Sequence, residues 1–198
     1  MINVLRGALL ALLVAAPMPA PLVPLFASRD DAVVAATPVP SPERPVGEVR
    51  LLRRGAAAVV QTVLDTALLP RVVAEIRNKE AANWPEGRPG RDDSARYVAA
   101  LEEVSAALRS QQPQDPRRRH RRLHLLIEFA LSADRAAVAI SGWERTDAGA
   151  VQRAEPSVVL QPSRDYVRAN MRLIAADSFH VDGSALDTLL APLPELRG

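Results

Sequence analysis

The sequence predicts an α+β fold in which helices precede and follow a small antiparallel sheet. Three observations predict it. Apolar residues recur with a helical period over residues 48–110, they alternate with polar residues after residue 122, and they return to helical spacing after residue 163. We therefore expect three N-terminal helices, a meander of about three strands and two C-terminal helices.

Length and composition fit one folded domain with an aliphatic core. The chain has 198 residues, of which 48% are hydrophobic and only 4% aromatic, and such a core needs no cofactor to fold. The 25 basic and 23 acidic residues nearly balance, so net charge gives little argument for an anionic partner. Because there is no cysteine, disulfides and thiolate metal sites are excluded.

Residues 1–27 have the layout of a secretory signal peptide. Arg6 precedes an uncharged apolar run over residues 7–16, and four prolines follow it before the first acidic residue. The pattern predicts a periplasmic or secreted protein, cleaved between Ala27 and Ser28. The alternatives are an uncleaved inner-membrane anchor and the buried N-terminal helix of a cytosolic protein.

Residues 28–47 are rich in proline, alanine and valine and have neither a helical nor a strand period. This composition is typical of an extended tether. We expect it to precede a single α+β domain over residues 48–198, with a helical part at 48–110 and the sheet with its helices at 117–198.

The first expected helix covers residues 48–69. Its polar residues fall on one stripe when spaced at 3.6 residues per turn, and apolar residues cover the remainder, which is typical of a largely buried helix. The stripe consists of Arg50, Arg54, Gln61 and Asp65.

Two further helices are expected before the sheet. Pro70 suits the start of a helix that ends near Asn83, because Trp84 precedes a proline and a breaker run follows. The third helix covers residues 93–110, with Asp92, Asp93 or Ser94 as its cap. The apolar spacing of this third helix predicts a core face.

The strands are predicted from residue 123 onward. Apolar and polar residues alternate over nine positions, and the turns "SADR" and "TDAG" lead into a second strand at 136–145 and a third at about 150–161. Ser163 then suits the cap of a helix that continues to residue 179, and a last helix is expected from Ser184.

Arginines form two groups that are candidates for binding an anionic or protein partner. Guanidinium groups bind phosphates and carboxylates with paired hydrogen bonds. The alternative interpretation is a solvated charged loop that protects a strand edge. The candidate residues are Arg117, Arg118, Arg119, Arg121 and Arg122 before the first predicted strand, with Arg164, Arg168 and Arg172 on the helix that follows the sheet.

The candidates for catalysis are few. His180, Asp182 and Ser184 lie together in "FHVDGS", although Asp-Gly-Ser before a helix is also ordinary turn and cap chemistry. His124 and Glu128 would be about 13 Å apart along a strand, too far to share one metal. We predict neither a metal nor a cofactor.

These observations favour an exported, envelope-associated binding or assembly module that is not an enzyme. Its partner would be an envelope protein, an anionic lipid or a polysaccharide. The alternatives are a small exported hydrolase that uses His180, Asp182 and Ser184, and an intracellular nucleic-acid-binding protein, which export would make improbable.

Overall fold

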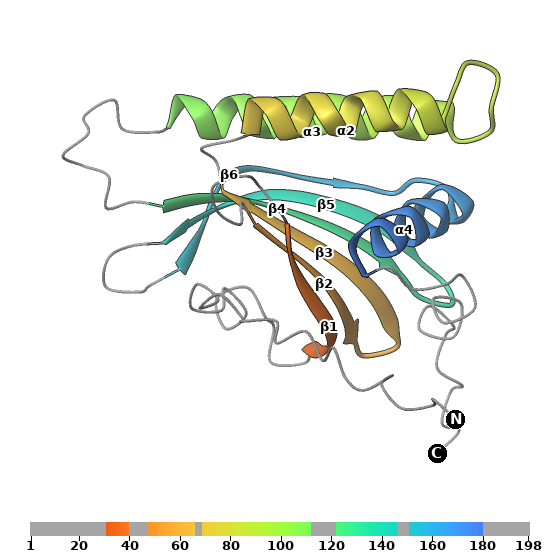
Figure 1. Ribbon diagram of the computed structural model, residues 1–198, viewed down its shortest axis with the longest axis horizontal. Helices are drawn as coiled ribbons and strands as arrows, with labels where there is room; N and C mark the ends of the chain where they lie inside the picture. The colour runs from red at the N-terminus through yellow and green to blue at the C-terminus, as the bar shows by residue number, and fades with distance from the viewer. Residues whose placement is uncertain (1–30, 40–46, 66–68, 112–121, 146–150, 180–198) are drawn as a thin grey trace, which may run out of the picture.

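The computed structural model describes residues 31–39, 47–65, 69–111, 122–145 and 151–179, and within these ranges it has six strands and three helices (Figure 1). In chain order they are β1 (Asp31–Val39), β2 (Gly47–Arg54), β3 (Ala57–Asp65), α2 (Leu69–Asn83), α3 (Arg91–Ser110), β4 (Arg122–Leu131), β5 (Ala136–Arg145), β6 (Val151–Leu160) and α4 (Arg164–Phe179).

The strands form one antiparallel meander whose spatial order is the chain order, from β1 at one edge to β6 at the other. The hairpin of α2 and α3 is inserted between β3 and β4, which nevertheless pair directly, with Asp65 opposite His124. The sheet is therefore continuous across the point where the chain leaves it for the helices.

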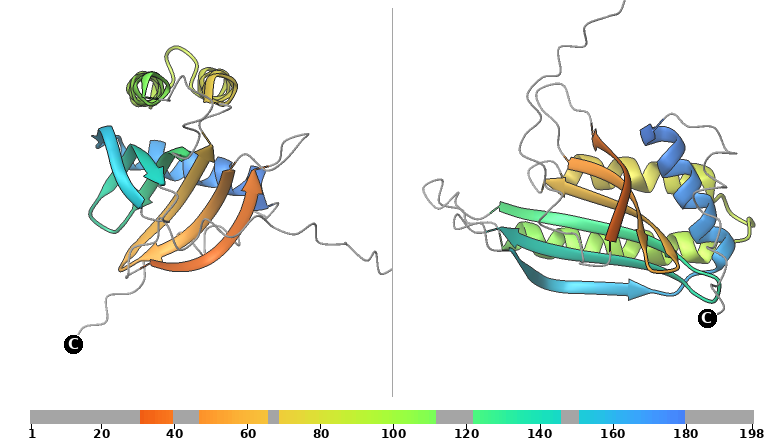
Figure 2. Two further views of the ribbon diagram at one scale, coloured as in Figure 1. Left: turned by 90° about the vertical axis from the view of Figure 1, so that its left-hand side faces the viewer. Right: turned by 90° about the horizontal axis from the view of Figure 1, so that it is seen from below.

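All three described helices lie on one face of the sheet, which we call the helix face. Figure 2 shows α2 and α3 side by side above the strongly twisted strands. Helix α3 packs on β4, β5 and β6, and α4 packs on β1, β3, β4 and β5, whereas α2 packs chiefly on α3. We call the opposite face, which no described helix covers, the second face.

The core fills the space between the helix face and the helices. Alternate residues of the strands contribute to it because side chains alternate between the two faces of a sheet. On β4 these are the apolar residues that the sequence pattern singles out: Leu123, Leu125, Ile127, Phe129 and Leu131. Their helical partners include Tyr97, Leu101, Val104, Leu108, Tyr166, Val167 and Met171.

The predicted arrangement of three helices, about three strands and two helices is wrong. Residues 48–65 form the hairpin of β2 and β3, joined by a two-residue turn in which Gly55 has a φ of 58°. Residues 49–52 and 58–61 are buried on both faces, so they do not show the alternation that identifies a strand. Arg50, Arg54, Gln61 and Asp65, which were expected to form a polar stripe on a helix, instead belong to the second face of the sheet.

Strand β1 lies within the segment expected to be a tether. It pairs with β2 from Asp31 opposite Arg54 to Val39 opposite Gly47, with a bulge between Val33 and Ala35. As an edge strand it accommodates Pro38, which cannot donate to a sheet hydrogen bond. These nine residues are thus part of the sheet rather than a spacer before it.

The predictions for the helices at 70–83, 93–110 and 164–179 and for the three later strands are confirmed within one to three residues at most ends. Gly90 is the residue before α3 and makes no side-chain cap, so the expected cap at residues 92–94 is wrong. The helix expected from Ser184 lies outside the described residues. Among the described helices, none is long and apolar enough to span a membrane.

Candidate functional site

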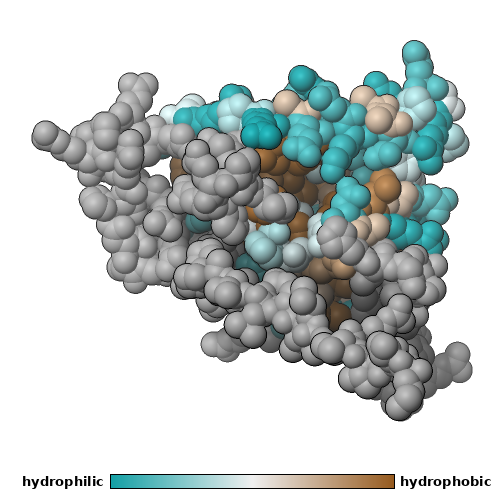
Figure 3. Space-filling view, in the orientation of Figure 1, coloured by the Kyte–Doolittle hydropathy of each residue, from teal (hydrophilic) through white to brown (hydrophobic). Residues whose placement is uncertain are grey.

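A cavity of about 860 Å³ lies between α2, α4 and the helix face of β1 to β4. Its size is typical of sites for small organic ligands. Figure 3 shows hydrophobic surface directly below α2 and α3, bordered by hydrophilic residues. The floor consists mainly of apolar strand residues, which are Pro38, Val39, Val49, Leu64, Ile127 and Phe129, with the hydroxyls of Thr37 and Thr62 among them.

Helix α2 forms one wall of this cavity because of how its residues are spaced. Val72, Ile76 and Glu80 are four residues apart, so they lie on one face of the helix, and all three line the cavity. α4 provides the opposite wall through Leu173 and Ile174. Since α2 packs chiefly on α3 and not on the sheet, space remains beneath it.

The mouth of the cavity carries charges of both signs. Lys79 of α2 is 58% exposed, and its Nζ lies 3.1 Å from Asp177 of α4 and 3.9 Å from Glu75. Arg71 lies on the same side of α2. The Lys79–Asp177 ion pair connects the two walls at the solvent, where such a pair contributes little to stability.

The carboxyl of Glu80 is the polar group at the inner end. Glu80 is only 5% exposed, and the hydroxyl of Tyr166 on α4 donates to its Oε2 at 2.9 Å. Burial raises the pKa of Glu80, an effect that the hydroxyls of Ser94 and Tyr166 oppose only in part. Burial and the nearby Glu80 also raise the pKa of Tyr166.

Asn170 lies one turn after Tyr166 on α4 and also lines the cavity. Its Nδ2 donates to the backbone oxygen of Tyr166 at 3.3 Å. The side-chain oxygen of Asn170 has no hydrogen-bond partner among the described residues. A carboxyl and an amide oxygen therefore belong to the lining at this end, beside the hydroxyl of Tyr97, and both oxygens are acceptors for a ligand that donates.

An aromatic cluster holds this end of the cavity in place. The ring of Trp84, at the end of α2, packs on the ring of Tyr166 with centroids 5.0 Å apart, and the guanidinium of Arg88 lies 4.8 Å from the centre of the Trp84 ring. Gly90 has a φ of 93°, and a Cβ there would lie 2.8 Å from the indole, so only glycine fits.

Asp93 connects α3 to α4 beside this cluster. Its Oδ2 accepts from the backbone nitrogen of Ser163 at 3.0 Å and from the Ser163 hydroxyl at 2.7 Å, and its Oδ1 accepts from Arg96. Burial opposes ionisation of Asp93, but these hydrogen bonds outweigh it and lower its pKa. The hydroxyl of Ser163, expected as a helix cap, serves this contact.

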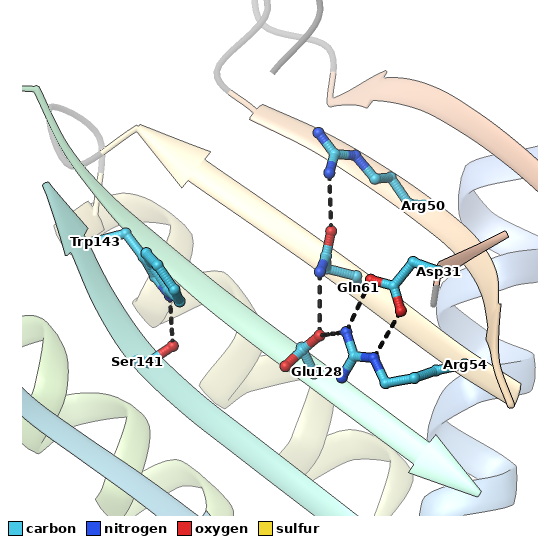
Figure 4. A network of polar contacts seen from close by, with 7 residues as sticks. All are labelled: Asp31, Arg50, Arg54, Gln61, Glu128, Ser141 and Trp143. Atoms are coloured by element: carbon cyan, nitrogen blue, oxygen red, sulfur yellow. Dashed lines mark hydrogen bonds and ion pairs between the residues drawn. The ribbon is translucent and has the colours of Figure 1, made fainter. Parts of the chain in front are cut away.

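The second face carries a different polar feature, a row of hydrogen-bonded side chains that we call the polar ladder (Figure 4). It comprises Asp31 of β1, Arg50 and Arg54 of β2, Gln61 of β3 and Glu128 of β4. Arg50 donates to Gln61 at 3.0 Å, and Gln61 and Arg54 both donate to Oε1 of Glu128, at 3.1 and 2.7 Å. Arg54 also donates to Asp31 at 2.7 Å.

The ladder is deeply buried at its centre, where Arg50 and Gln61 are both 0% exposed. The hydrogen bonds that Arg54 donates to Asp31 raise the pKa of Arg54 further, so the positive charge of Arg54 is permanent. Each polar atom shared between strands fixes their register, because a slip by one residue would move these side chains to the helix face. We interpret the polar ladder as structural.

Most residues that the sequence nominates for a site lie outside the described residues. These are Arg117, Arg118, Arg119 and Arg121, and the catalytic candidates His180, Asp182 and Ser184. The structure gives only the backbone of Arg122, at the start of β4. Both the anion-binding and the hydrolase hypotheses therefore stay predictions.

The second arginine group lies on α4, where its members are four residues apart. Arg168 is largely exposed and lies 3.9 Å from Asp165, whereas Nη1 of Arg164 is buried and has no hydrogen bond. The three arginines therefore differ in environment. Within the part of the chain described here, no group of three or more His, Asp or Glu side chains is placed to hold a metal ion.

Neither Glu80 nor Asn170 was expected from the sequence. Glu80 belongs to a helix that was correctly predicted, and it lies four residues after Ile76 on the apolar side. An acidic residue on an apolar stripe is the signal that could have identified Glu80.

Comparisons of the chain with protein-family models, with curated proteins and with solved structures give no match.

Proposed function

We propose that this protein is an exported, non-catalytic binding protein that holds a small, mainly apolar ligand in the helix-face cavity. The observation that carries the proposal is the cavity itself, with its floor of strand residues and its walls of α2 and α4. A cavity of this size with an apolar floor and polar residues along its border is the usual form of a small-molecule site.

Two features support binding rather than a gap left by loose packing. The inner end is held by the Glu80–Tyr166 hydrogen bond and by the packing of Trp84 on Tyr166, so this end is built from fixed side chains. At the mouth, the exposed ion pair between Lys79 and Asp177 connects α2 to α4, and the two charges separate at small free-energy cost. A rigid inner end and a weakly closed mouth suit reversible entry.

Export is the second part of the proposal, and the layout of residues 1–27 supports it. The expected cleavage between Ala27 and Ser28 precedes Asp31, where β1 begins, so the processed chain would keep the whole sheet. Fractionation of cells with intact-mass measurement tests it: a periplasmic or secreted chain beginning near Ser28 supports export, and a full-length cytosolic chain refutes it.

The binding proposal is tested with the uncharged fluorescent probe N-phenyl-1-naphthylamine. We expect saturable binding of one probe per chain, and at least a tenfold loss in Ile76→Trp, which fills the cavity from α2. The matched control is Val159→Trp, because Val159 is 57% exposed on the second face of β6 and lies far from the lining residues in register.

Circular dichroism would establish that both tryptophan variants are folded. If Ile76→Trp does not fold, Thr62→Phe takes its place, because it fills the cavity from the floor. Absence of probe binding to the unaltered chain, or equal binding to the filled and control variants, would refute the cavity as a binding site.

A further inference from the structure

The shape of the cavity indicates an elongated ligand. The lining stripe of α2 runs from Val72 to Glu80, and eight residues of helix span about 12 Å. Apolar residues line most of this length on α2, on α4 and on the floor. The buried carboxyl and amide acceptors of the lining, Glu80 and Asn170, lie at one end, whereas the floor adds only the hydroxyls of Thr37 and Thr62. The ligand that matches this distribution has an apolar body and a single polar end.

The charges argue against an anionic polar end. At the mouth, Arg71 and Lys79 are balanced by Glu75 and Asp177. At the inner end the ionisable group is an acid, Glu80, and no cation among the lining residues is buried beside it. A carboxylate or phosphate brought there would lose its hydration and gain no opposite charge, which is costly in an apolar site.

The hydrogen-bonding groups argue for a donor at that end. The side-chain oxygen of Asn170 has no partner among the described residues, and the carboxyl of Glu80 accepts from Tyr166 at Oε2 and lies beside the hydroxyl of Ser94. A hydroxyl donates one hydrogen bond and accepts another, so it satisfies an acceptor here without a buried charge. A site built around such a bond discriminates against analogues that lack the donor.

We propose that the ligand of the helix-face cavity is an elongated apolar molecule with an uncharged hydroxyl at one end, and that this hydroxyl lies between Glu80 and Asn170. This inference rests on the proposed function, because it names the ligand class for the same cavity. Long-chain alcohols and hydroxylated lipids share the required chemistry.

The test compares three molecules of similar length in displacing N-phenyl-1-naphthylamine from the folded, unaltered protein at pH 8. Decan-1-ol carries the hydroxyl, methyl nonyl ether lacks the donor, and decanoate is anionic. We expect decan-1-ol to displace the probe at a concentration at least tenfold lower than either analogue. Equal displacement by the ether, or stronger displacement by decanoate, overturns the inference.

Two variants assign the selectivity to the named residues. Glu80→Gln is expected to reduce discrimination against decanoate, since it removes the acid, and Asn170→Leu is expected to reduce discrimination against the ether, since it removes the acceptor. Glu102→Gln is the control, because Glu102 of α3 is 47% exposed, forms an ion pair with Arg77 and does not line the cavity, so it should alter neither ratio.

The two proposals fail in different ways. If the probe does not bind, the cavity is no ligand site and both proposals fall. If the probe binds but decan-1-ol has no advantage over the ether and decanoate, the binding function stands and the hydroxyl inference is wrong. The selectivity of the unaltered protein decides the inference even where a variant does not fold.

Discussion

The two faces of the sheet differ in how the same strands use their side chains. On β3, Leu64 faces the helices and lines a cavity, whereas Gln61 on the second face joins the polar ladder. The helix face is apolar and leaves space beneath α2. The second face is polar at its centre, where Arg50, Gln61 and Glu128 hydrogen-bond across three strands.

This difference shows how one sheet separates stability from binding. The members of the polar ladder hydrogen-bond to one another across β1 to β4, so they connect these strands without a ligand. The cavity over the helix face has acceptors at Glu80 of α2 and Asn170 of α4 that are suited to an added donor. Binding is therefore expected on the helix face, and register is expected to depend on the second face.

The largest effect is expected from a pair of adjacent leucines on β4 that face opposite ways. Leu125 is fully buried within the core between sheet and helices, whereas Leu126 is buried on the second face outside that core. Leu125→Ala should lower the free energy of unfolding by about 3–5 kcal/mol, and Leu126→Ala by about 2 kcal/mol. Urea denaturation measures both, and an equal loss would remove the energetic distinction between the faces.

A smaller loss in the free energy of unfolding is expected when hydrogen bonds of the polar ladder are removed. Gln61→Leu removes the acceptor of Arg50 and a donor to Glu128, and it should lower the free energy of unfolding by about 2–3 kcal/mol. Its neighbour Thr62 faces the cavity, so Thr62→Val should cost less than about 1 kcal/mol. Equal stability of the two variants would show that the polar ladder contributes nothing to register or stability.

The smallest effect concerns pH and distinguishes two buried acids of the helical layer. The pKa of Glu80 is raised above its ordinary value of 4.5 in the folded protein. The buried carboxyl therefore costs no stability through ionisation below pH 4.5, and stability is lost as pH rises through the folded pKa. The lowered pKa of Asp93 has the opposite sign, so its contribution is present at higher pH and is lost as pH falls through its folded value.

Thermal unfolding followed from pH 3 to 8 measures both slopes. Glu80→Gln should flatten the fall in stability on the alkaline side, and Asp93→Asn should flatten the fall on the acidic side. Slopes that are the same in both variants and in the unaltered chain would be inconsistent with these assignments.

Elements whose two sides differ in polarity could be predicted from the sequence, and those without such a difference could not. Helices α2, α3 and α4 show an apolar period because one side contacts the core and the other contacts solvent. β4 is buried on both faces, but its second face carries the polar residues His124 and Glu128, so the alternation remains visible. β2 and β3 have consecutive buried residues that include apolar ones on both faces, and β1 is an edge strand with a proline. Neither a helical period nor a strand alternation therefore identifies these three strands as strands.

The cavity could not be predicted because it depends on distances between elements distant in the sequence. Glu80 and Tyr166 meet only when α2 and α4 lie on the same face of the sheet. Local pattern placed both residues on helices but gave no information on the space between the helices. The two arginine groups were prominent for the opposite reason, since charge runs are visible without any tertiary structure.

The insertion of α2 and α3 between two paired strands also has a consequence for folding kinetics. Within β1–β3 and within β4–β6 the strands are close along the chain, whereas pairing of β3 with β4 must close the long segment that contains both helices. Such non-local contacts lose more chain entropy before they gain stability, and they slow folding. We therefore expect β3 and β4 to join late. The floor of the cavity spans β1 to β4, so the capacity to bind a ligand is among the last properties that the chain acquires.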